Sequence, residues 1–269
     1  MSKNLIKDYW NKESCGTDIA KQHEKYSRAY FDQIEDYRYD HEAYIFEFAQ
    51  FSRFYGKKIL EVGVGAGTDF INFCRSGSEA YGIDLTEEAI NNVKHRLKVY
   101  SLTCKELKVA DAENLPYKDN FFDLVYSWGV IHHTENTIKA LEEIIRVLKL
   151  GGIGKIMIYN RYALDSLSLY IKYGIMKLRP FRSLDFIYSK YQESPGTKVF
   201  SISEIRKILS NYPIKIIQTS AEVGNDELYG RGDQKFFTNI YRIFFRIITF
   251  FLGRKNVGTN LRIEFKKIS

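Results

Sequence analysis

A short apolar run followed by closely spaced glycines is the part of this sequence best suited to binding a nucleoside. Residues 57–84 read KKILEVGVGAGTDFINFCRSGSEAYGID. Gly63, Gly65 and Gly67 let a backbone turn sharply and approach a ligand, because no Cβ stands in the way. Glu61 lies just before them, at the expected end of the first run. The stretch predicts a strand, a ligand-binding loop, a helix and a second strand.

The carboxylates in this stretch favour one kind of cofactor over another. A dinucleotide fingerprint, G-x-G-x-x-G, would place its last glycine where this chain has Thr68, which is expected to cap the helix 69–76 instead. Glu61 would repel a pyrophosphate but suits a cofactor that carries an ammonium and a sulfonium. Asp84 closes the second run, where a carboxylate can accept hydrogen bonds from both hydroxyls of a ribose. A nicotinamide oxidoreductase remains the rival class.

These residues resemble those of the class I S-adenosylmethionine (SAM)-dependent methyltransferases, most closely the broad group that includes quinone-biosynthesis methyltransferases. The resemblance implies a Rossmann-like α/β fold, with a seven-stranded, mostly parallel sheet. It implies that the glycine loop wraps the methionine part of SAM, that Asp84 binds the ribose and that Leu85 packs on the adenine. The cofactor would leave as S-adenosylhomocysteine (SAH), and no metal is expected.

Later motifs follow in the order that the resemblance requires. A third apolar run ends at Asp111, to which the resemblance gives a hydrogen bond from the adenine amino group. A fourth run covers 122–127, and the segment 146–152 reads RVLKLGG, departing from the family's pattern only in Leu150, where proline is usual. The cofactor-binding residues expected on this basis are Glu61, Gly63, Gly65, Gly67, Thr68, Asp84, Leu85, Asp111, Ala112 and Ser127.

Two adjacent histidines are the candidate catalytic residues. His132 and His133 follow the fourth run, at the sheet edge where ligands bind in parallel sheets. Histidine titrates near neutrality and can take a proton from a methyl acceptor, although neighbouring residues point in different directions, so that at most one is expected to face the acceptor. Local packing of both is the alternative. Tyr159, Asn160 and Arg161 follow the fifth run and are candidates for orienting the substrate.

The elements that must position these residues divide the chain into four parts. An aromatic and charged N-terminal helical cap is expected over 1–55, with Tyr9, Trp10, Tyr26 or Tyr39 near the cofactor. The SAM-binding core follows over 56–161. A helical lid insertion is expected over 162–212, where Tyr188, Tyr191 and the turn 194–197 are candidate elements of the acceptor site. The last two strands, with an intervening amphipathic helix, are expected within 213–269.

Composition limits the remaining choices. The 269 residues carry a formal charge of +7 and 45% hydrophobic residues, which is enough for a large core. Cys15, Cys74 and Cys104 are widely spaced, which argues against a disulfide framework or a zinc site and favours a cytoplasmic protein. The segment 239–252 is apolar with two arginines, so peripheral membrane contact or a homodimer contact are both open, whereas the lysines and arginines do not form an evident nucleic-acid groove.

The sequence therefore predicts a SAM-dependent methyltransferase that modifies an oxygen or nitrogen of a small-molecule metabolite, such as a sugar or a secondary metabolite. A lipid or quinone acceptor at a membrane surface is the alternative. An RNA methyltransferase and a non-catalytic SAM-binding regulator rank lower.

Overall fold

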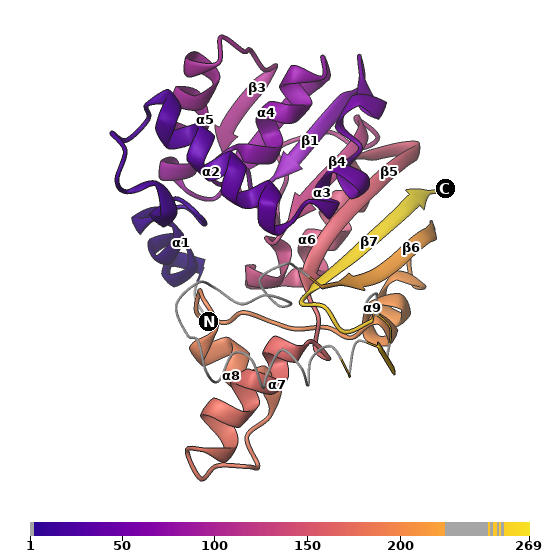
Figure 1. The fold of residues 1–269 in the computed structure, drawn as a ribbon. Helices are drawn as coiled ribbons and strands as arrows, with labels where there is room; N and C mark the ends of the chain where they lie inside the picture. Colours follow the sequence, from indigo (N-terminus) through magenta and orange to yellow (C-terminus); the bar gives the residue numbers. More distant parts are fainter. Residues whose placement is uncertain (1–2, 224–246, 248–249, 252, 254–255) are drawn as a thin grey trace.

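The computed structural model describes residues 3–223, 247, 250–251, 253 and 256–269. A seven-stranded sheet forms its centre, as expected from the sequence (Figure 1). The strands are β1 (Lys58–Val62), β2 (Glu79–Asp84), β3 (Glu106–Val109), β4 (Phe122–Trp128), β5 (Leu148–Tyr159), β6 (Ile214–Glu222) and β7 (Asn260–Lys267).

The strand order is β3-β2-β1-β4-β5-β7-β6. The first five strands pair in parallel, whereas β7 pairs antiparallel with both β5 and β6. The order reverses direction between β1 and β4, so the carboxyl ends of these two strands form the edge where a ligand fits best in such a sheet.

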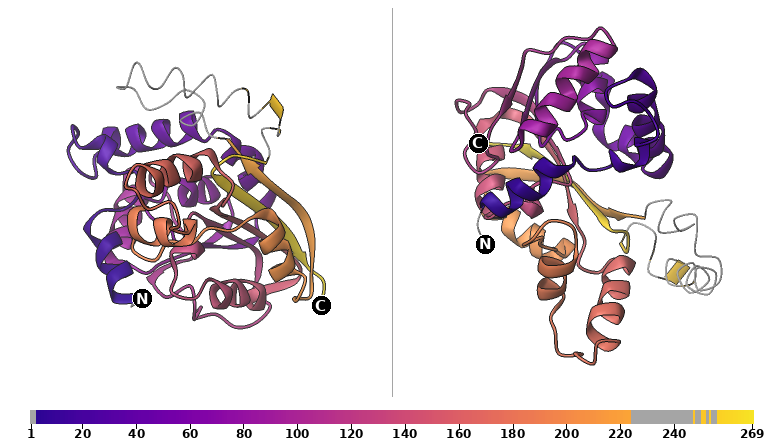
Figure 2. Two further views of the ribbon diagram at one scale, coloured as in Figure 1. Left: turned by 90° about the horizontal axis from the view of Figure 1, so that it is seen from below. Right: turned by 90° about the vertical axis from the view of Figure 1, so that its left-hand side faces the viewer.

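Helices cover both faces of the sheet (Figures 1 and 2). Leu60 and Val62 of β1 pack in one core with α6, whereas Ile59 packs in a second core with α4 and α5, because successive strand residues point to opposite faces. The helical elements are α1 (Lys3–Lys12), η1 (Asp18–Ala20), α2 (Arg28–His41), α3 (Tyr44–Ala49), η2 (Phe51–Phe54), α4 (Thr68–Arg75), α5 (Glu87–Val99), η3 (Ile131–His133), α6 (Thr137–Val147), α7 (Leu164–Tyr170), η4 (Ile171–Ile175), α8 (Leu184–Tyr191) and α9 (Ile202–Leu209).

Side-chain caps fix where several helices begin. Thr86 accepts a hydrogen bond from the backbone N–H of Ala89 at the start of α5, as the sequence predicts. Thr68 does not cap α4. Gly67, at a φ of 77°, is the N-cap, and Thr68 is the first helical residue. The left-handed turn of the glycine loop reaches the helix one residue earlier than expected, which leaves the Thr68 hydroxyl to accept a hydrogen bond from Arg96.

Two predicted features concern the segment 239–252, most of which lies outside the described residues, and the expected helical insertion over 162–212. The segment 239–252 lies outside the described residues except for 247, 250 and 251, so its expected amphipathic helix remains a prediction. Residues 164–209 contain the helices α7, η4, α8 and α9, and α7 and α8 project away from the sheet (Figure 1). Among the described residues, no helix combines the length and the apolarity needed to cross a membrane.

Candidate functional site

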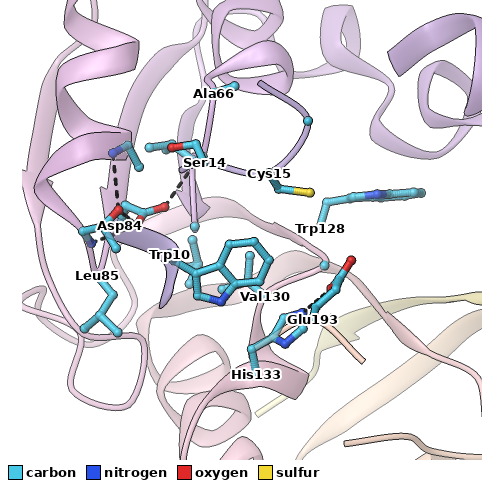
Figure 3. A pocket seen from close by; sticks show the side chains of 18 of the residues that line it. Trp10, Ser14, Cys15, Ala66, Asp84, Leu85, Trp128, Val130, His133 and Glu193 are labelled. Atoms are coloured by element: carbon cyan, nitrogen blue, oxygen red, sulfur yellow. Dashed lines mark hydrogen bonds and ion pairs between the residues drawn. The ribbon is translucent and has the colours of Figure 1, made fainter. Parts of the chain in front are cut away.

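A cavity of about 860 Å³ lies at the carboxyl ends of the parallel strands. Its walls include α1 and α2 of the N-terminal segment, the loops that follow β1, β2, β3 and β4, the end of β5, one residue of α7, the segment after α8 and the start of β7. Figure 3 shows Asp84 and Leu85 at one side of it and His133, Trp128 and Glu193 at the other, with Trp10 between them. The cavity can therefore hold two ligands or one long one.

The glycine loop forms the wall nearest β1. Gly63, Gly65 and Gly67 all have left-handed backbone angles, with φ of 81°, 51° and 77°. A Cβ on Gly63 would lie 2.2 Å from a methyl carbon of Val130, so the β1 and β4 loops touch here. A Cβ on Gly65 would meet nothing within 4 Å. Gly65 lines the cavity, whereas Gly67 does not and instead packs against Val93 of α5.

Glu61 is a buried carboxylate with an unused oxygen. Its side chain lines the cavity, only 3% of the residue is exposed, and its Oε2 has no hydrogen-bond partner among the described residues. Burial and then the negative charge of Asp69 raise the pKa of Glu61 well above its usual value, against a smaller opposing effect of Arg38. An unpaired buried carboxylate is costly to keep and gains most from a cationic or hydrogen-bond-donating ligand.

Asp84 is held in place by its own loop. Its Oδ1 accepts hydrogen bonds from the backbone N–H and the hydroxyl of Thr86, at 2.9 and 2.8 Å, and its Oδ2 accepts one from the N–H of Gly65 at 3.1 Å. Burial raises the pKa of Asp84 although these bonds oppose the shift. Oδ1 thus has both lone pairs occupied, whereas Oδ2 keeps a lone pair that a hydroxyl can use.

Asp111 already has a partner from the N-terminal helix. The amino group of Lys3, in α1, pairs with Asp111 at 2.5 Å and with Glu113 at 3.3 Å. These ion pairs fasten α1 across the end of the cavity next to β3. Ala112 and Leu85 line the same end.

His133 stands at the opposite end of the cavity within a network of polar groups. Its Nε2 lies 3.3 Å from the carboxylate of Glu193, which also accepts a hydrogen bond from the Tyr159 hydroxyl at 2.8 Å. Its Nδ1 lies 2.8 Å from Ser194 Oγ and 2.9 Å from Thr197 Oγ1. Glu193 has a φ of 49°, a left-handed angle that is uncommon without glycine, so the turn after α8 holds this carboxylate in a strained conformation beside the imidazole.

The hydroxyl of Thr197 indicates how His133 can handle a proton. Because it donates its own proton to the carbonyl of Ser194 at 2.6 Å, it offers a lone pair to Nδ1. Nδ1 can then carry its proton toward Thr197 and leave Nε2 free to take another. The carboxylate of Glu193 would stabilise the resulting imidazolium.

The cavity is acidic although the chain is basic. Among the described residues that line it, eleven are aspartate or glutamate and three are lysine or arginine, namely Lys3, Lys12 and Arg38. Lys3 is paired as described above, and Arg38 makes two hydrogen bonds to Asp69, at 3.1 and 2.7 Å. The acidic residues are Glu13, Asp18, Glu42, Glu61, Asp69, Asp84, Asp111, Glu113, Glu135, Asp165 and Glu193. The arrangement favours a cationic ligand.

Most of the residues expected from the sequence meet at this cavity, and five do not. Besides Gly67, these are Ser127, His132, Asn160 and Arg161. The structure places these five outside the lining of the cavity, and the contacts of the four with side chains are described below. The residues that line the cavity as expected are Glu61, Gly63, Gly65, Thr68, Asp84, Leu85, Asp111, Ala112, His133 and Tyr159.

Ser127 and His132 turn into the core. The Ser127 hydroxyl donates to the carbonyl of Val62 across the strand pair, and alternation along β4 gives the cavity wall to Trp128 instead. His132 is fully buried against the ring of Tyr159, with no hydrogen-bond partner for either ring nitrogen among the described residues. Burial lowers its pKa well below the usual value, so this residue stays neutral.

Asn160 and Arg161 serve the structure around the end of β5. The Asn160 amide donates to the carbonyl oxygens of Asn256 and Gly258. The Arg161 guanidinium pairs with Asp185 and Glu204, and so ties β5 to α8 and α9.

Several cavity residues were not expected from the sequence. Trp128 could have been found, because it immediately follows the predicted fourth strand. No sequence pattern marks Glu193 or Arg38 as a cavity residue, because the position of each depends on how segments distant in sequence pack together. Tyr9 and Trp10 line the cavity as anticipated, whereas Tyr26 and Tyr39 do not.

No group of three histidine, cysteine or acidic side chains suited to a metal occurs in the described part of the chain.

Comparisons with known proteins agree with this fold and loop chemistry. The family profile described as "Methyltransferase domain" matches residues 60–155. The chain is 28% identical over 106 residues to the uncharacterized methyltransferase YcgJ of Bacillus subtilis, covering 39% of this chain and 41% of that protein. It is 35% identical over 98 residues to norajmaline N-methyltransferase of Rauvolfia serpentina, covering 36% and 34%.

Structural similarity to solved proteins covers more of the chain than these sequence matches do. Magnesium protoporphyrin IX methyltransferase (ChlM) from Synechocystis PCC 6803, solved with bound SAH, superposes with a TM-score of 0.60 at 16% identity, covering 99% of this chain and 100% of that one. The chain spans only about a third to a half of the length of the two relatives named above.

Proposed function

We propose, from the match of residues 60–155 to the methyltransferase-domain family, that the protein transfers a methyl group from SAM to the nitrogen of a small-molecule amine. The observation that carries the proposal is the acidic cavity, with the unpaired Glu61 at one end and the His133–Glu193 pair at the other. Oxygen acceptors, which the sequence leaves open, are less well matched to this charge.

The residues at the glycine-loop end fit SAM. Glu61 offers a lone pair to the ammonium, the open face of Gly65 admits close approach, and Asp84 Oδ2 can accept from a ribose hydroxyl. Leu85 and Ala112 provide apolar contacts for the adenine. The bound SAH of the structural neighbour supports the same cofactor here. When bound, SAM supplies an electrophilic methyl group, so the protein's part is positioning, exclusion of water and handling of a proton.

The acceptor would bind among Trp10, Trp128, Tyr159 and Glu193. Aromatic faces and a carboxylate together recognise an ammonium group. A protonated amine cannot act as a nucleophile, so a base must remove its proton first. His133 Nε2 is the candidate base, since Thr197 favours a proton on Nδ1 and Glu193 stabilises the charged ring.

We assign residues 162–212 to a lid over the acceptor end and residues 1–55 to a cap over the cofactor. Gln192 and Glu193 from the former region and Trp10 from the latter line the cavity, which supports this division. Their closure would exclude water from the reacting groups.

The experiment that tests the proposal uses purified protein, methyl-labelled SAM and a fractionated host extract. Labelled products from the polar fraction are passed over a cation exchanger in acid, which retains methylated amines and releases methyl ethers and esters. Retained label that depends on the protein is the expected result. Label in neutral products, in lipid or in macromolecules would overturn the amine acceptor, and tight NADH binding without SAM binding would overturn the cofactor.

A further inference from the structure

A hairpin of residues 171–186 carries a group of apolar side chains into solvent. It consists of η4, the connecting segment 176–183 and the start of α8, and it projects from the body of the molecule in both Figure 1 and the right-hand view of Figure 2. Phe181 is entirely exposed, Leu178 is 89% exposed and Met176 is 72% exposed. Ile175 and Phe186 are 51% and 41% exposed. Several large apolar side chains exposed within one short segment are typical of a site of interaction.

The hairpin has a fixed shape. Leu178 donates its N–H to Ile175 and Arg179 donates to Gly174, so the backbone turns back on itself. Leu178 has a φ of 55°, a strained angle for a γ-branched residue. The rings of Tyr173 and Tyr191 stack across the base, with centroids 4.1 Å apart and planes 2° apart. The apolar side chains are therefore presented outward by an ordered scaffold.

The charge of this hairpin is almost entirely positive. Residues 171–186 contain four basic side chains, Lys172, Lys177, Arg179 and Arg182, and a single acidic one, Asp185. Asp185 is neutralised by Arg161, through hydrogen bonds of 2.9 Å to each of its oxygens. Lys172, Lys177 and Arg179 are exposed beside the apolar side chains.

We propose that the hairpin 171–186 is a docking surface for a membrane that contains anionic lipids. Apolar side chains at a tip, flanked by lysines and arginines, match the acyl boundary and the anionic headgroups of a bilayer surface, and the two contributions add. The proposal does not depend on the proposed methyl transfer.

The charge argues against a second copy as the partner. In a two-fold contact each hairpin would face the same set of cations on the other, and like charges at close range repel. An acidic protein surface could also pair with the basic side chains of the hairpin. Absence of vesicle binding in the experiment below would favour that alternative.

The position of the hairpin gives docking a consequence for the cavity. Asp165 of α7 and Glu193, just after the end of α8, both line the cavity, so α7 and the segment that follows α8 form part of its wall. A docked hairpin would place this wall next to the lipid surface.

Flotation of the full chain with vesicles tests the proposal. One set of vesicles contains phosphatidylcholine alone, and the other contains phosphatidylcholine with phosphatidylglycerol. Wild-type protein is expected to float with the anionic vesicles and to bind less as salt is raised. The double variant Leu178→Ser/Phe181→Ser is expected to partition at least about tenfold less, since two exposed apolar groups are lost without any loss of core packing. Lys177→Gln/Arg179→Gln should lose about tenfold on anionic vesicles only.

A matched control removes apolar side chains elsewhere on the surface. Tyr55 and Leu150 are 75% and 67% exposed and lie outside the hairpin, so Tyr55→Ser/Leu150→Ser should float as wild type does. A Phe181→Trp variant should shift its fluorescence to shorter wavelength when anionic vesicles are added. Absence of wild-type flotation, or equal flotation of the hairpin variants, would overturn the proposal. So would a change from dimer to monomer in Leu178→Ser/Phe181→Ser without vesicle binding, which would assign the surface to a protein contact.

Discussion

At the scale of single residues, Glu61 links ligand binding to stability. Its buried carboxylate lacks a partner for Oε2, so replacing it with the isosteric, uncharged amide in Glu61→Gln should stabilise the protein without ligand by about 1–3 kcal/mol. The same change should weaken SAM binding by about tenfold to a hundredfold, because a charged hydrogen bond is lost. Thermal melts and calorimetric titration measure the two effects, and a variant that binds SAM as tightly as wild type would remove Glu61 from the cofactor site.

The pH dependence follows from the same side chain. Burial raises the folded-state pKa of Glu61 above its unfolded value. The folded protein therefore holds this proton to higher pH than the unfolded chain does, and the contribution of Glu61 to stability is present in acid and declines as pH rises through that raised pKa. Glu61→Gln should lose this part of the pH dependence, which melts across a pH series would detect.

His133 and His132 provide a matched pair for testing the base. His133→Ala should lower kcat by about 10²–10⁴-fold with little change in SAM affinity, because a base acts on the acceptor and not on the cofactor. His132→Leu should retain a much larger share of kcat, since this buried ring packs on His133 and Tyr159 but does not itself line the cavity. Equal losses in both variants would point to packing as the common cause.

At the scale of elements, the turn from β1 to α4 depends on where each glycine lies. Gly63→Ala and Gly65→Ala both place a Cβ on a left-handed residue, at about 1–2 kcal/mol. Only Gly63→Ala also drives that Cβ into Val130, which adds about 1–3 kcal/mol of overpacking. Denaturant melts should show the larger loss for Gly63→Ala. Adding Val130→Ala should recover part of it, and no recovery would show that backbone strain alone causes the loss.

The sequence could predict the position of a residue at the cavity where the order of strands along the chain is sufficient to place it. Asp84 and Asp111 follow strands, and the carboxyl ends of parallel strands meet at one edge, so their place at the cavity needed no knowledge of side-chain direction. Ser127 lies outside the cavity lining because alternation along β4 points its neighbour Trp128 at the cavity. Arg161 also lies outside it, because its partners, Asp185 and Glu204, come from helices whose packing the sequence does not reveal.

At the scale of the whole molecule, the signs of charge are separated. The chain has an excess of seven positive charges, yet the cavity is lined mainly by acids and the hairpin 171–186 is flanked mainly by bases. A net positive charge by itself favours anionic partners without indicating where on the molecule they would bind. Composition gives only the sum of all charges in the chain. The folded structure separates them, so that a cationic ligand suits the cavity and an anionic surface suits the hairpin.

The ion pairs of Lys3 with Asp111 and Glu113 also bear on the timing of ligand exchange. A ligand that displaces the Lys3 amine from Asp111 would enter by a two-step exchange, in which this contact of α1 opens first. In such an exchange the rate of entry stops increasing once the ligand is abundant, and the opening frequency of the helix then sets the ceiling.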